Sequence, residues 1–261
     1  MRSSRFAGKT LAEVAGKPLL GYLLDRLELC RNLHQTIVST TEEREDSAIE
    51  QYCQSRHIFC YRGDEHDVLG RLLESYKAVD AEIGVVVFGD GPLVDPMIVD
   101  QAIDLYLAMP DYDFVGNDLI TTYPPGMEVE VFSIRALSES AELCKSSTIR
   151  EHGTLYLRTN PDVFHLYNFE AEKSLQRPDL ALEVDTFEDF QVIQKILEHF
   201  GDRVSFSLQE IIEFVDEIIE RRQQEIAEEH GYELVDHALV LYVRPRGSDV
   251  TRQDSGPTNR K

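Results

Sequence analysis

A short apolar run near the middle of the chain, residues 83–88, predicts a buried strand. Its β-branched residues do not alternate with polar ones, which is typical of a strand covered on both faces inside a parallel sheet. The run ends in a Gly-Asp-Gly-Pro turn at residues 89–92, so Asp90 lies at the carboxyl end of the predicted strand. Because ligands of open α/β sheets bind at that edge, the turn marks the predicted functional edge of the protein.

Helical and extended patterns alternate on both sides of this strand. Apolar residues at three- and four-residue spacing predict helices, and short apolar runs between turn residues predict strands. The predicted helices cover residues 19–27, 42–54, 67–79, 97–109, 146–158 and 187–200. The other predicted strands cover residues 36–40, 58–61, 113–117, 127–132 and 163–167. This alternation predicts an α/β protein with a doubly wound, mostly parallel sheet.

Length and charge narrow the classes of function. A chain of 261 residues with 42% hydrophobic content can bury one sizeable core, or one core and a small appendage. It carries 48 acidic and 26 basic side chains, a formal net charge of −22. Since a nucleic-acid surface needs a basic excess, nucleic acid is not an expected partner. Any phosphate site must be a local group of Arg and Lys within an acidic protein.

Cysteine usage and hydropathy indicate the compartment. The four cysteines have no CxxC spacing, so reduced and buried thiols are expected. No apolar run approaches the length of a membrane span, and the first residues lack the apolar core of a secretion signal. These observations predict a cytoplasmic protein with no membrane partner.

Two aspartates share one kind of position, the junction between an extended segment and a helix. Asp90 follows the central strand, and Asp185 precedes the helix predicted for residues 187–200. If both converge on one Mg²⁺ ion, they form a reasonable site for phosphoryl or nucleotidyl transfer. The alternative is that Asp90 only caps the helix that opens near Asp95, and the spacing alone weighs the two about evenly.

The first nine residues combine two Arg, one Lys and several small residues. Gly and Ser allow backbone amides to approach phosphates closely, while Arg and Lys neutralise their charge. A flexible basic terminus is the alternative, and composition alone favours it.

Further candidate ligands lie in two later segments. Glu128 and Glu130 share one face of the predicted strand 127–132, whose alternation predicts that it is half exposed. They are either solvated charges or, beside a metal or a sugar, ligands. Arg150 and His152 lie in the predicted helix 146–158, where a surface ion-pair network is the alternative.

Several motifs follow one another along most of the chain. In order they are Arg2-Ser3-Ser4-Arg5-Phe6-Ala7-Gly8-Lys9, Arg62-Gly63 with Asp67-Val68-Leu69 and Arg71, residues 89–96, residues 128–132, Arg150-Glu151-His152, and Val184-Asp185 followed by Glu188-Asp189-Phe190. From residue 1 to about 208 the chain resembles the cytidylyltransferase family of polysaccharide biosynthesis. That family includes spore-coat polysaccharide proteins and their relatives that make CMP-activated acidic sugars.

The resemblance implies a fold, a reaction and a set of site residues. The fold is like that of nucleotide-diphospho-sugar transferases, and Rossmann-like. A sugar oxygen attacks the α-phosphate of CTP, pyrophosphate leaves, and Mg²⁺ is the cofactor. The implied catalytic residues are Lys9, Asp90 and Asp185, of which the two aspartates hold the metal. The residues implied to bind the nucleotide are Arg2, Ser3, Arg5, Gly8, Lys9, Gly89 and Pro92. Those implied to contact the sugar, an acidic one by the resemblance, are Asn117, Glu128, Glu130, Arg150 and His152.

This chain also departs from the family pattern. The family begins with an apolar strand that runs into Gln-Ala-Arg, and no such strand precedes the basic loop here, so the resemblance implies a start upstream of Met1. The family's usual Cys in the central turn is Gly91. Where the family has Arg-Trp-Thr, residues 181–183 read Ala-Leu-Glu, without the Arg that would hold a sugar carboxylate. A catalytically degenerate or truncated relative that acts in binding or dimerisation is therefore the alternative function.

The C-terminal part predicts an appendage at residues 209–244, a helix followed by a strand at 233–243. It resembles the dimerisation half of the ferric uptake regulator family, which implies metal-ligand positions at Glu213, Glu220 and His237. The other ligands and the DNA-reading part of that family are missing, so a strand edge that pairs with a second copy in a homodimer is favoured. Residues 245–261, rich in Pro, Gly, Ser and charge, predict a disordered tail.

Overall fold

The computed structural model describes residues 6–230, which belong to two compact units, residues 1–216 and 217–261. The first unit holds every described strand and the helices up to the start of α9 (Leu208–Glu229); the described part of the second unit is the rest of α9. The domain boundary predicted at residue 208 stays a prediction; the two units divide between residues 216 and 217. The strand predicted at 233–243 and the tail predicted at 245–261 lie outside the described residues.

The larger sheet of the first unit has four strands in the order β5 (Ile83–Val86), β7 (Glu130–Ser133), β6 (Phe114–Gly116) and β8 (Leu166–Asn168). β7 runs antiparallel to both of its neighbours, with Val131 opposite Val85 and Val115. β6 and β8 are parallel. The alternation of strands and helices, and with it the predicted α/β fold, is confirmed. The antiparallel β7, which the alternation did not predict, makes this sheet mixed.

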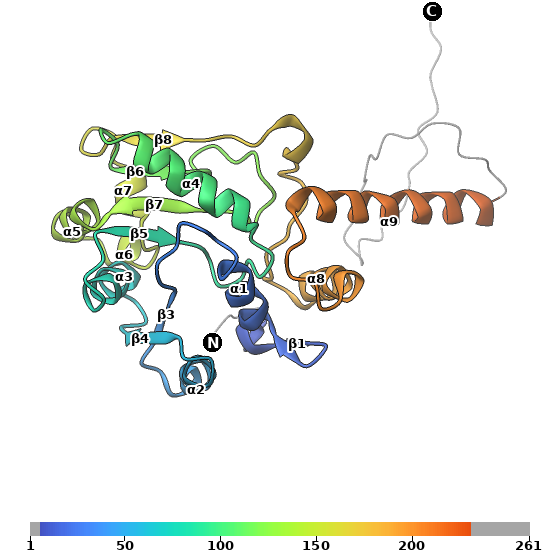
Figure 1. Cartoon of the computed structure of the whole chain (residues 1–261), viewed down its shortest axis with the longest axis horizontal. Helices are drawn as coiled ribbons and strands as arrows, with labels where there is room; N and C mark the ends of the chain where they lie inside the picture. The colour runs from blue at the N-terminus through green and yellow to red at the C-terminus, as the bar shows by residue number, and fades with distance from the viewer. Residues whose placement is uncertain (1–5, 231–261) are drawn as a thin grey trace, which may run out of the picture. The chain divides into compact units, whose positions relative to one another are not determined.

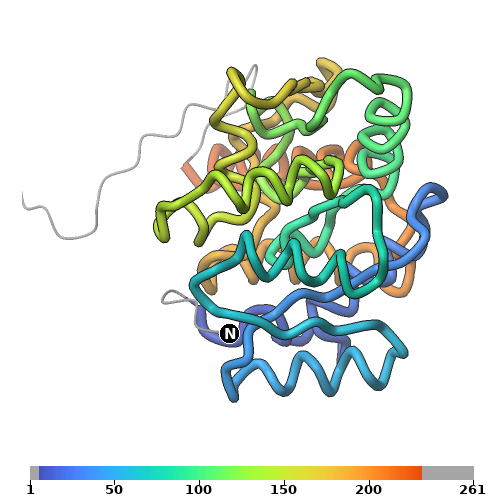
Figure 2. The backbone as a smooth tube through the Cα atoms, turned by 90° about the vertical axis from the view of Figure 1, so that its left-hand side faces the viewer, coloured from blue at the N-terminus to red at the C-terminus, as the bar shows by residue number. Residues whose placement is uncertain are grey.

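A second, parallel pair consists of β3 (Ile37–Thr41) and β4 (Phe59–Gly63). Figures 1 and 2 agree that this pair lies beside β5, on the side away from β7. A short antiparallel hairpin, β1 (Glu13–Val14) and β2 (Lys17–Pro18), precedes the first helix.

Helices of the first unit surround these strands (Figure 1). They are α1 (Leu19–Leu27), α2 (Ser47–Ser55), α3 (Val68–Lys77), α4 (Pro96–Ala108), α5 (Ile134–Leu143), α6 (Ser147–Arg150), α7 (Leu155–Arg158) and α8 (Phe187–Phe200). Three short 3₁₀ turns are η1 (Lys9–Leu11), η2 (Arg44–Asp46) and η3 (Lys173–Leu175). In residues 6–230 no helix combines the length and the apolar character needed to cross a lipid bilayer.

The larger sheet is buried on both faces. Val115 and Val131 point into one cluster with α1, α4 and α8, whereas Phe114 and Phe132 point into another with α3 and α5. Successive strand residues face opposite sides of a sheet, so neighbouring positions on β6 and β7 supply both clusters. This two-sided burial agrees with the predicted doubly wound arrangement.

Three local predictions were wrong. The strand predicted as half exposed at 127–132 is β7, whose residues 130–132 are buried because it is an inner strand with helices on both faces. The central run is buried less completely than predicted, since Ile83 is 38% exposed and Val85 is only partly buried. The predicted helix 146–158 is two short helices, α6 and α7, separated by a turn.

Candidate active site

The ammonium group of Lys9 lies between two carboxylates. Its Nζ is 3.0 Å from an oxygen of Asp90 and 3.0 Å from an oxygen of Asp185. The Lys9 side chain is 16% exposed, and those of Asp90 and Asp185 are 31% and 29% exposed. The three residues predicted as catalytic therefore meet at one partly open point.

Asp90 reaches this point from the turn after β5, which is closed by a hydrogen bond from the Gly91 N–H to the Phe88 carbonyl. The nearby helix α4 has a different cap, because the carboxylate of Asp95 accepts from the Met97 N–H at 2.9 Å. The alternative reading of Asp90 as the cap of that helix is wrong, and its carboxylate faces Lys9 instead.

Asp185 is positioned by the start of α8. Thr186 and Asp189 form a reciprocal capping box, and the Asp189 carboxylate also accepts from the Asp185 N–H at 3.1 Å. The two loops are joined as well, since the Val184 N–H donates to the Asp90 carbonyl at 2.8 Å. Backbone hydrogen bonds thus hold both carboxylates in place.

The charges at this point favour a cation. Burial alone would lower the pKa of Lys9, but hydrogen bonds and charges from Asp185 and Asp90 outweigh it and raise that pKa. Burial is the largest cause that raises the pKa of Glu183, and the nearby charges of Asp90 and Asp185 raise it further. Among the described residues, Lys9 bonds Asp90 and Asp185, and Glu183 interacts with all three by charge, so the carboxylates at this point outnumber the ammonium group.

The two aspartates suit Mg²⁺ as a pair. Both direct an oxygen at a single cationic nitrogen, so they already share one cation position. Among residues 6–230 no group of three or more His, Cys, Asp or Glu side chains is arranged to hold a metal. Mg²⁺ in nucleotide sites is bound by one or two carboxylates and completes its shell with water and substrate phosphates. The carboxylate oxygens of Asp90 and Asp185 fit this type of Mg²⁺ coordination.

The predicted nucleotide-binding residues are placed unevenly. Arg2, Ser3 and Arg5 lie outside the described residues. Gly8 precedes η1 with a positive φ of 76°, and so brings Lys9 back toward the aspartates. Gly89 is exposed beside Asp90, with open space where a side chain would project, whereas Pro92 is buried under the turn. Gly8, Lys9 and Gly89 therefore lie where a triphosphate could approach.

The predicted sugar contacts Asn117, Glu128 and Glu130 form hydrogen bonds within the protein. The buried Asn117 amide bonds the Met127 carbonyl and the Val129 N–H, each at 2.8 Å. Glu128 accepts from the Gly126 N–H at 2.7 Å, and burial raises its pKa.

Glu130 is fully buried and accepts from the Thr154 hydroxyl at 2.6 Å. Arg158 pairs with both Glu130 and Asp118. Burial, and next the charge of Asp118, raise the pKa of Glu130 to about 8. A role for these three residues in sugar binding stays a prediction.

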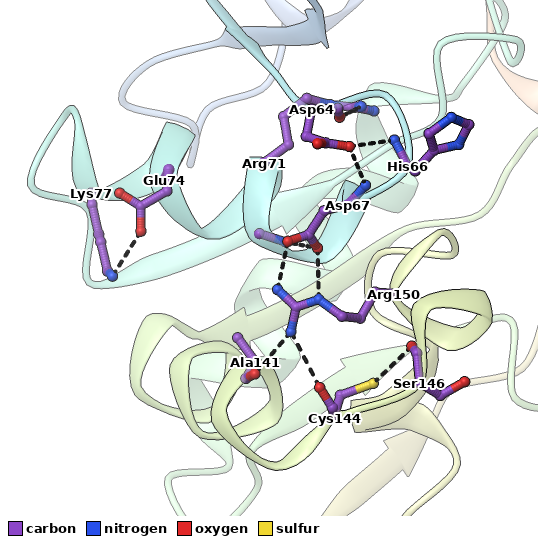
Figure 3. A network of polar contacts seen from close by, with 11 residues as sticks. Asp64, His66, Asp67, Arg71, Glu74, Lys77, Ala141, Cys144, Ser146 and Arg150 are labelled. Atoms are coloured by element: carbon purple, nitrogen blue, oxygen red, sulfur yellow. Dashed lines mark hydrogen bonds and ion pairs between the residues drawn. The ribbon is translucent and has the colours of Figure 1, made fainter.

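Arg150 acts as a connector between α6 and α3 (Figure 3). Its guanidinium group donates to both carboxylate oxygens of Asp67, at 2.9 and 2.7 Å, and to the carbonyls of Ala141 and Cys144. His152 is exposed in the turn that follows α6. The structure thus gives Arg150 protein partners and leaves His152 accessible; their contact with a sugar also stays a prediction.

Sequence reasoning assigned no role to several residues that shape the site. The capping box at Thr186 and Asp189 has the recognisable spacing of a Thr followed three residues later by an acid. Phe6 packs edge-on against Phe187 and Phe190, with ring centroids 5.9 and 5.6 Å away, and anchors the loop before Lys9. No local pattern marks Glu183, whose position depends on the folded chain.

Of the metal positions implied by the ferric uptake regulator resemblance, Glu213 and Glu220 lie on α9. Glu213 accepts a hydrogen bond from Gln209 one turn earlier. His237 is outside the described residues.

Comparison with known proteins places the chain in a family. The family model described as cytidylyltransferase matches residues 1–232, a range that includes Glu213 and Glu220. An uncharacterized protein of Methanocaldococcus jannaschii is 32% identical over 214 residues, which cover 82% of this chain and 86% of the relative. The spore coat polysaccharide biosynthesis protein SpsF of Bacillus subtilis is 27% identical over 218 residues, 81% of this chain and 89% of the relative.

A solved structure agrees with this assignment. A cytidylyltransferase from Leptospira borgpetersenii superposes with a TM-score of 0.79 at 28% identity, over 84% of this chain and 92% of that protein. This similarity concerns the fold as a whole, so the roles of Lys9, Asp90 and Asp185 rest on the geometry described above. The chain belongs to the cytidylyltransferase family.

Proposed function

We propose that the protein transfers CMP from CTP to a sugar, with release of pyrophosphate, in the synthesis of a surface polysaccharide or glycan. The observation that carries this proposal is the convergence of Lys9, Asp90 and Asp185. The family assignment supports a cytidylyl group as the one transferred. Similarity to a spore coat polysaccharide biosynthesis protein supports a sugar as the acceptor.

Each residue has a role in this proposal. Lys9 binds the triphosphate, because its ammonium group lies between Asp90 and Asp185 and because Gly89, the residue before Asp90, is exposed with open space around it. Asp90 and Asp185 hold Mg²⁺, whose positive charge would offset the negative charge of the transferring phosphoryl group. The backbone hydrogen bonds that fix Val184, Asp185 and the turn at Asp90 keep these groups oriented before the substrate arrives.

Binding of CTP must rearrange the site. Lys9 bonds both aspartates, so if Asp90 and Asp185 held Mg²⁺, the Lys9 ammonium group would be free to contact the phosphates of CTP. No covalent nucleophile is required, since the sugar oxygen attacks the α-phosphate directly and the bond to pyrophosphate breaks.

The proposal is tested by thermal unfolding with each of the four nucleoside triphosphates, with and without Mg²⁺. CTP with Mg²⁺ is expected to raise the melting temperature most, and this increase should be lost in Asp185→Asn. Equal shifts by all four nucleotides would refute cytidine selection. No shift with any of them would favour the alternative, a relative that has lost catalysis. Formation of a homodimer through residues 209–244 stays a prediction for sedimentation analysis.

A further inference from the structure

A tight turn at residues 124–127 precedes β7. The Met127 N–H donates to the Pro124 carbonyl at 3.1 Å and closes the turn. Pro125 and Gly126 lie between them, and Gly126 has a positive φ of 99°. Proline in the second position and glycine with a positive φ in the third are the features of a type II turn. We call this the Pro-Gly turn, and its central peptide group consists of the Pro125 carbonyl and the Gly126 N–H.

The central peptide group of the Pro-Gly turn has a hydrogen-bond partner at each end. The Gly126 N–H donates to the Glu128 carboxylate at 2.7 Å. The Pro125 carbonyl accepts from the Leu182 N–H, also at 2.7 Å. Because a peptide group is planar and rigid, a contact that fixes its N–H also fixes the direction of its carbonyl. The Glu128 side chain therefore helps to aim the Pro125 carbonyl at Leu182.

The central peptide group could adopt one other orientation. Type I and type II turns close with the same hydrogen bond, but ψ of the second residue and φ of the third differ, which rotates the central peptide by about half a turn. Glycine adopts either sign of φ readily, so Gly126 does not itself prevent the rotation. The rotation would break the bonds to Glu128 and Leu182. Gly126 is buried, so its N–H would lose a partner where water cannot easily replace it.

Leu182 links the Pro-Gly turn to the segment that carries Asp185. Its N–H bonds the Pro125 carbonyl, and two residues later the Val184 N–H donates to the Asp90 carbonyl at 2.8 Å. The segment before Asp185 is therefore attached at two points, one on the Pro-Gly turn and one on the turn after β5. Loss of the first attachment leaves only the second to set the position of Asp185.

Hydrogen bonding, and not charge pairing, accounts for the place of Glu128. Within residues 6–230 its half-buried carboxylate forms no ion pair, and the neighbouring charges of Glu183 and Asp118 have the same sign. A buried charge is costly unless hydrogen bonds compensate for it. The bond from the Gly126 N–H is such a compensation. The contact thus stabilises both the carboxylate and the orientation of the turn.

We propose that Glu128 is a positioning residue for the candidate active site. Its carboxylate holds the central peptide of the Pro-Gly turn in the orientation that binds Leu182. The segment that carries Asp185 is thereby kept against the turn of Asp90. The effect of Glu128 on metal and nucleotide binding rests on the proposed function, in which the two aspartates hold Mg²⁺. Its effect on the Pro-Gly turn does not depend on that function.

Two substitutions separate the reach of the side chain from its charge. Glu128→Gln keeps an acceptor oxygen at the same reach, whereas Glu128→Asp keeps the charge but is one methylene shorter. Hydrogen exchange at the Gly126 and Leu182 amides should be at least about tenfold faster in Glu128→Asp than in the wild type, and within about threefold in Glu128→Gln. Glu128→Ala, which also lacks the acceptor, takes the place of Glu128→Asp if that variant does not fold.

The Val129 amide, which bonds the Asn117 side chain, is the internal control and should change little. Unchanged exchange at Gly126 and Leu182 in Glu128→Asp would overturn the proposal. So would an equal rise at Val129, because it would indicate a general loss of stability.

Binding of CTP with Mg²⁺ measures the effect on the site. The dissociation constant, from calorimetry at a temperature where each variant is folded, should rise at least about tenfold in Glu128→Asp and less than about twofold in Glu128→Gln. Glu142→Asp, the same change at an exposed position on α5, is the matched control and should bind like the wild type. The reverse order, with weaker binding by Glu128→Gln than by Glu128→Asp, would show that the charge acts and would overturn the proposal.

A wild type that binds no CTP would refute the proposed function instead. Exchange at Gly126 and Leu182 would then decide the role of Glu128 in the Pro-Gly turn by itself.

Discussion

The backbone N–H of Val184 donates a hydrogen bond to the backbone carbonyl of Asp90 at 2.8 Å. This one bond joins the turn after β5 to the segment before α8, and so sets the two aspartates side by side. Next to it, three backbone segments touch without side chains between them. A Cβ added to Gly91 would lie 2.6 Å from the Gly126 carbonyl oxygen, and one added to Gly126 would lie 2.6 Å from the backbone of Leu182.

Gly91→Ala should therefore destabilise the protein by about 1–3 kcal/mol, because the backbone of the neighbouring turn must shift to admit the methyl group. The loss is measured by urea unfolding. Gly89→Ala is the control, since its Cβ would project into open space. Equal stabilities for the two variants would mean that the contact between the loops is looser than the structure shows.

The buried carboxyl group of Glu130 predicts a pH-dependent stability. Its pKa is near ~4.3 in an unfolded chain, and burial raises it to about 8 in the folded protein. The folded state therefore keeps a proton that the unfolded state releases, so this group's contribution is fully present below about pH 4.3 and declines as the pH rises through 8. Glu130→Gln, which can still accept from Thr154, should flatten that part of the profile.

Unfolding midpoints between pH 5 and 8.5 measure this effect. Glu142→Gln, an exposed position on α5, is the matched control and should keep the wild-type slope. A Glu130→Gln profile as steep as that of the wild type would show that another group causes the pH dependence.

Arg150 and Asp67 form a bidentate pair that connects α6 to α3. Arg150→Lys keeps the charge but loses the planar fork, so we expect a loss of about 1 kcal/mol in unfolding free energy. A double-mutant cycle with Asp67→Asn should show that the two losses are not additive. If Arg150→Lys instead leaves stability unchanged and raises the KM for the sugar, Arg150 contacts the substrate, as the family resemblance implies.

Lys9 is the counter-ion of Asp90 and Asp185. Lys9→Met removes it, so the carboxylates repel each other until a cation takes its place. Mg²⁺ at millimolar concentration should then raise the melting temperature of Lys9→Met by about 3 °C or more beyond its effect on the wild type. Lys17→Met, which loses an ion pair with Asp25 instead, is the control. If Mg²⁺ raised the melting temperatures of the wild type, Lys9→Met and Lys17→Met equally, the metal would not bind at Asp90 and Asp185.

The sequence predicted elements well where their ends carry local signals. The helix predicted for residues 187–200 is α8 to the residue, because Thr186 caps its start and Gly201 ends it. The burial of β7 could not be predicted in this way. Glu128 and Glu130 suggested a solvated face, whereas Thr154 and Arg158, which lie later in the chain, make the burial of Glu130 possible.

The site was predictable in part. Asp90 and Asp185 each occupy a recognisable junction, but only the folded chain brings them to one nitrogen atom. Lys9 came from the family resemblance, since its composition alone favoured a flexible terminus. No sequence pattern marked Glu183, because only the folded chain brings its carboxyl group near Asp90 and Asp185.

The central claim is that Asp90 and Asp185 hold the metal for nucleotidyl transfer. The most direct measurement is Mg²⁺-dependent release of pyrophosphate from CTP with a panel of acidic and neutral sugars, with the CMP-linked product identified by mass spectrometry. Asp90→Asn should lower the rate by about a hundredfold or more with little change in melting temperature, and Asp104→Asn, an exposed aspartate on α4, should leave it unchanged. Turnover in Asp90→Asn at the wild-type rate would contradict the account.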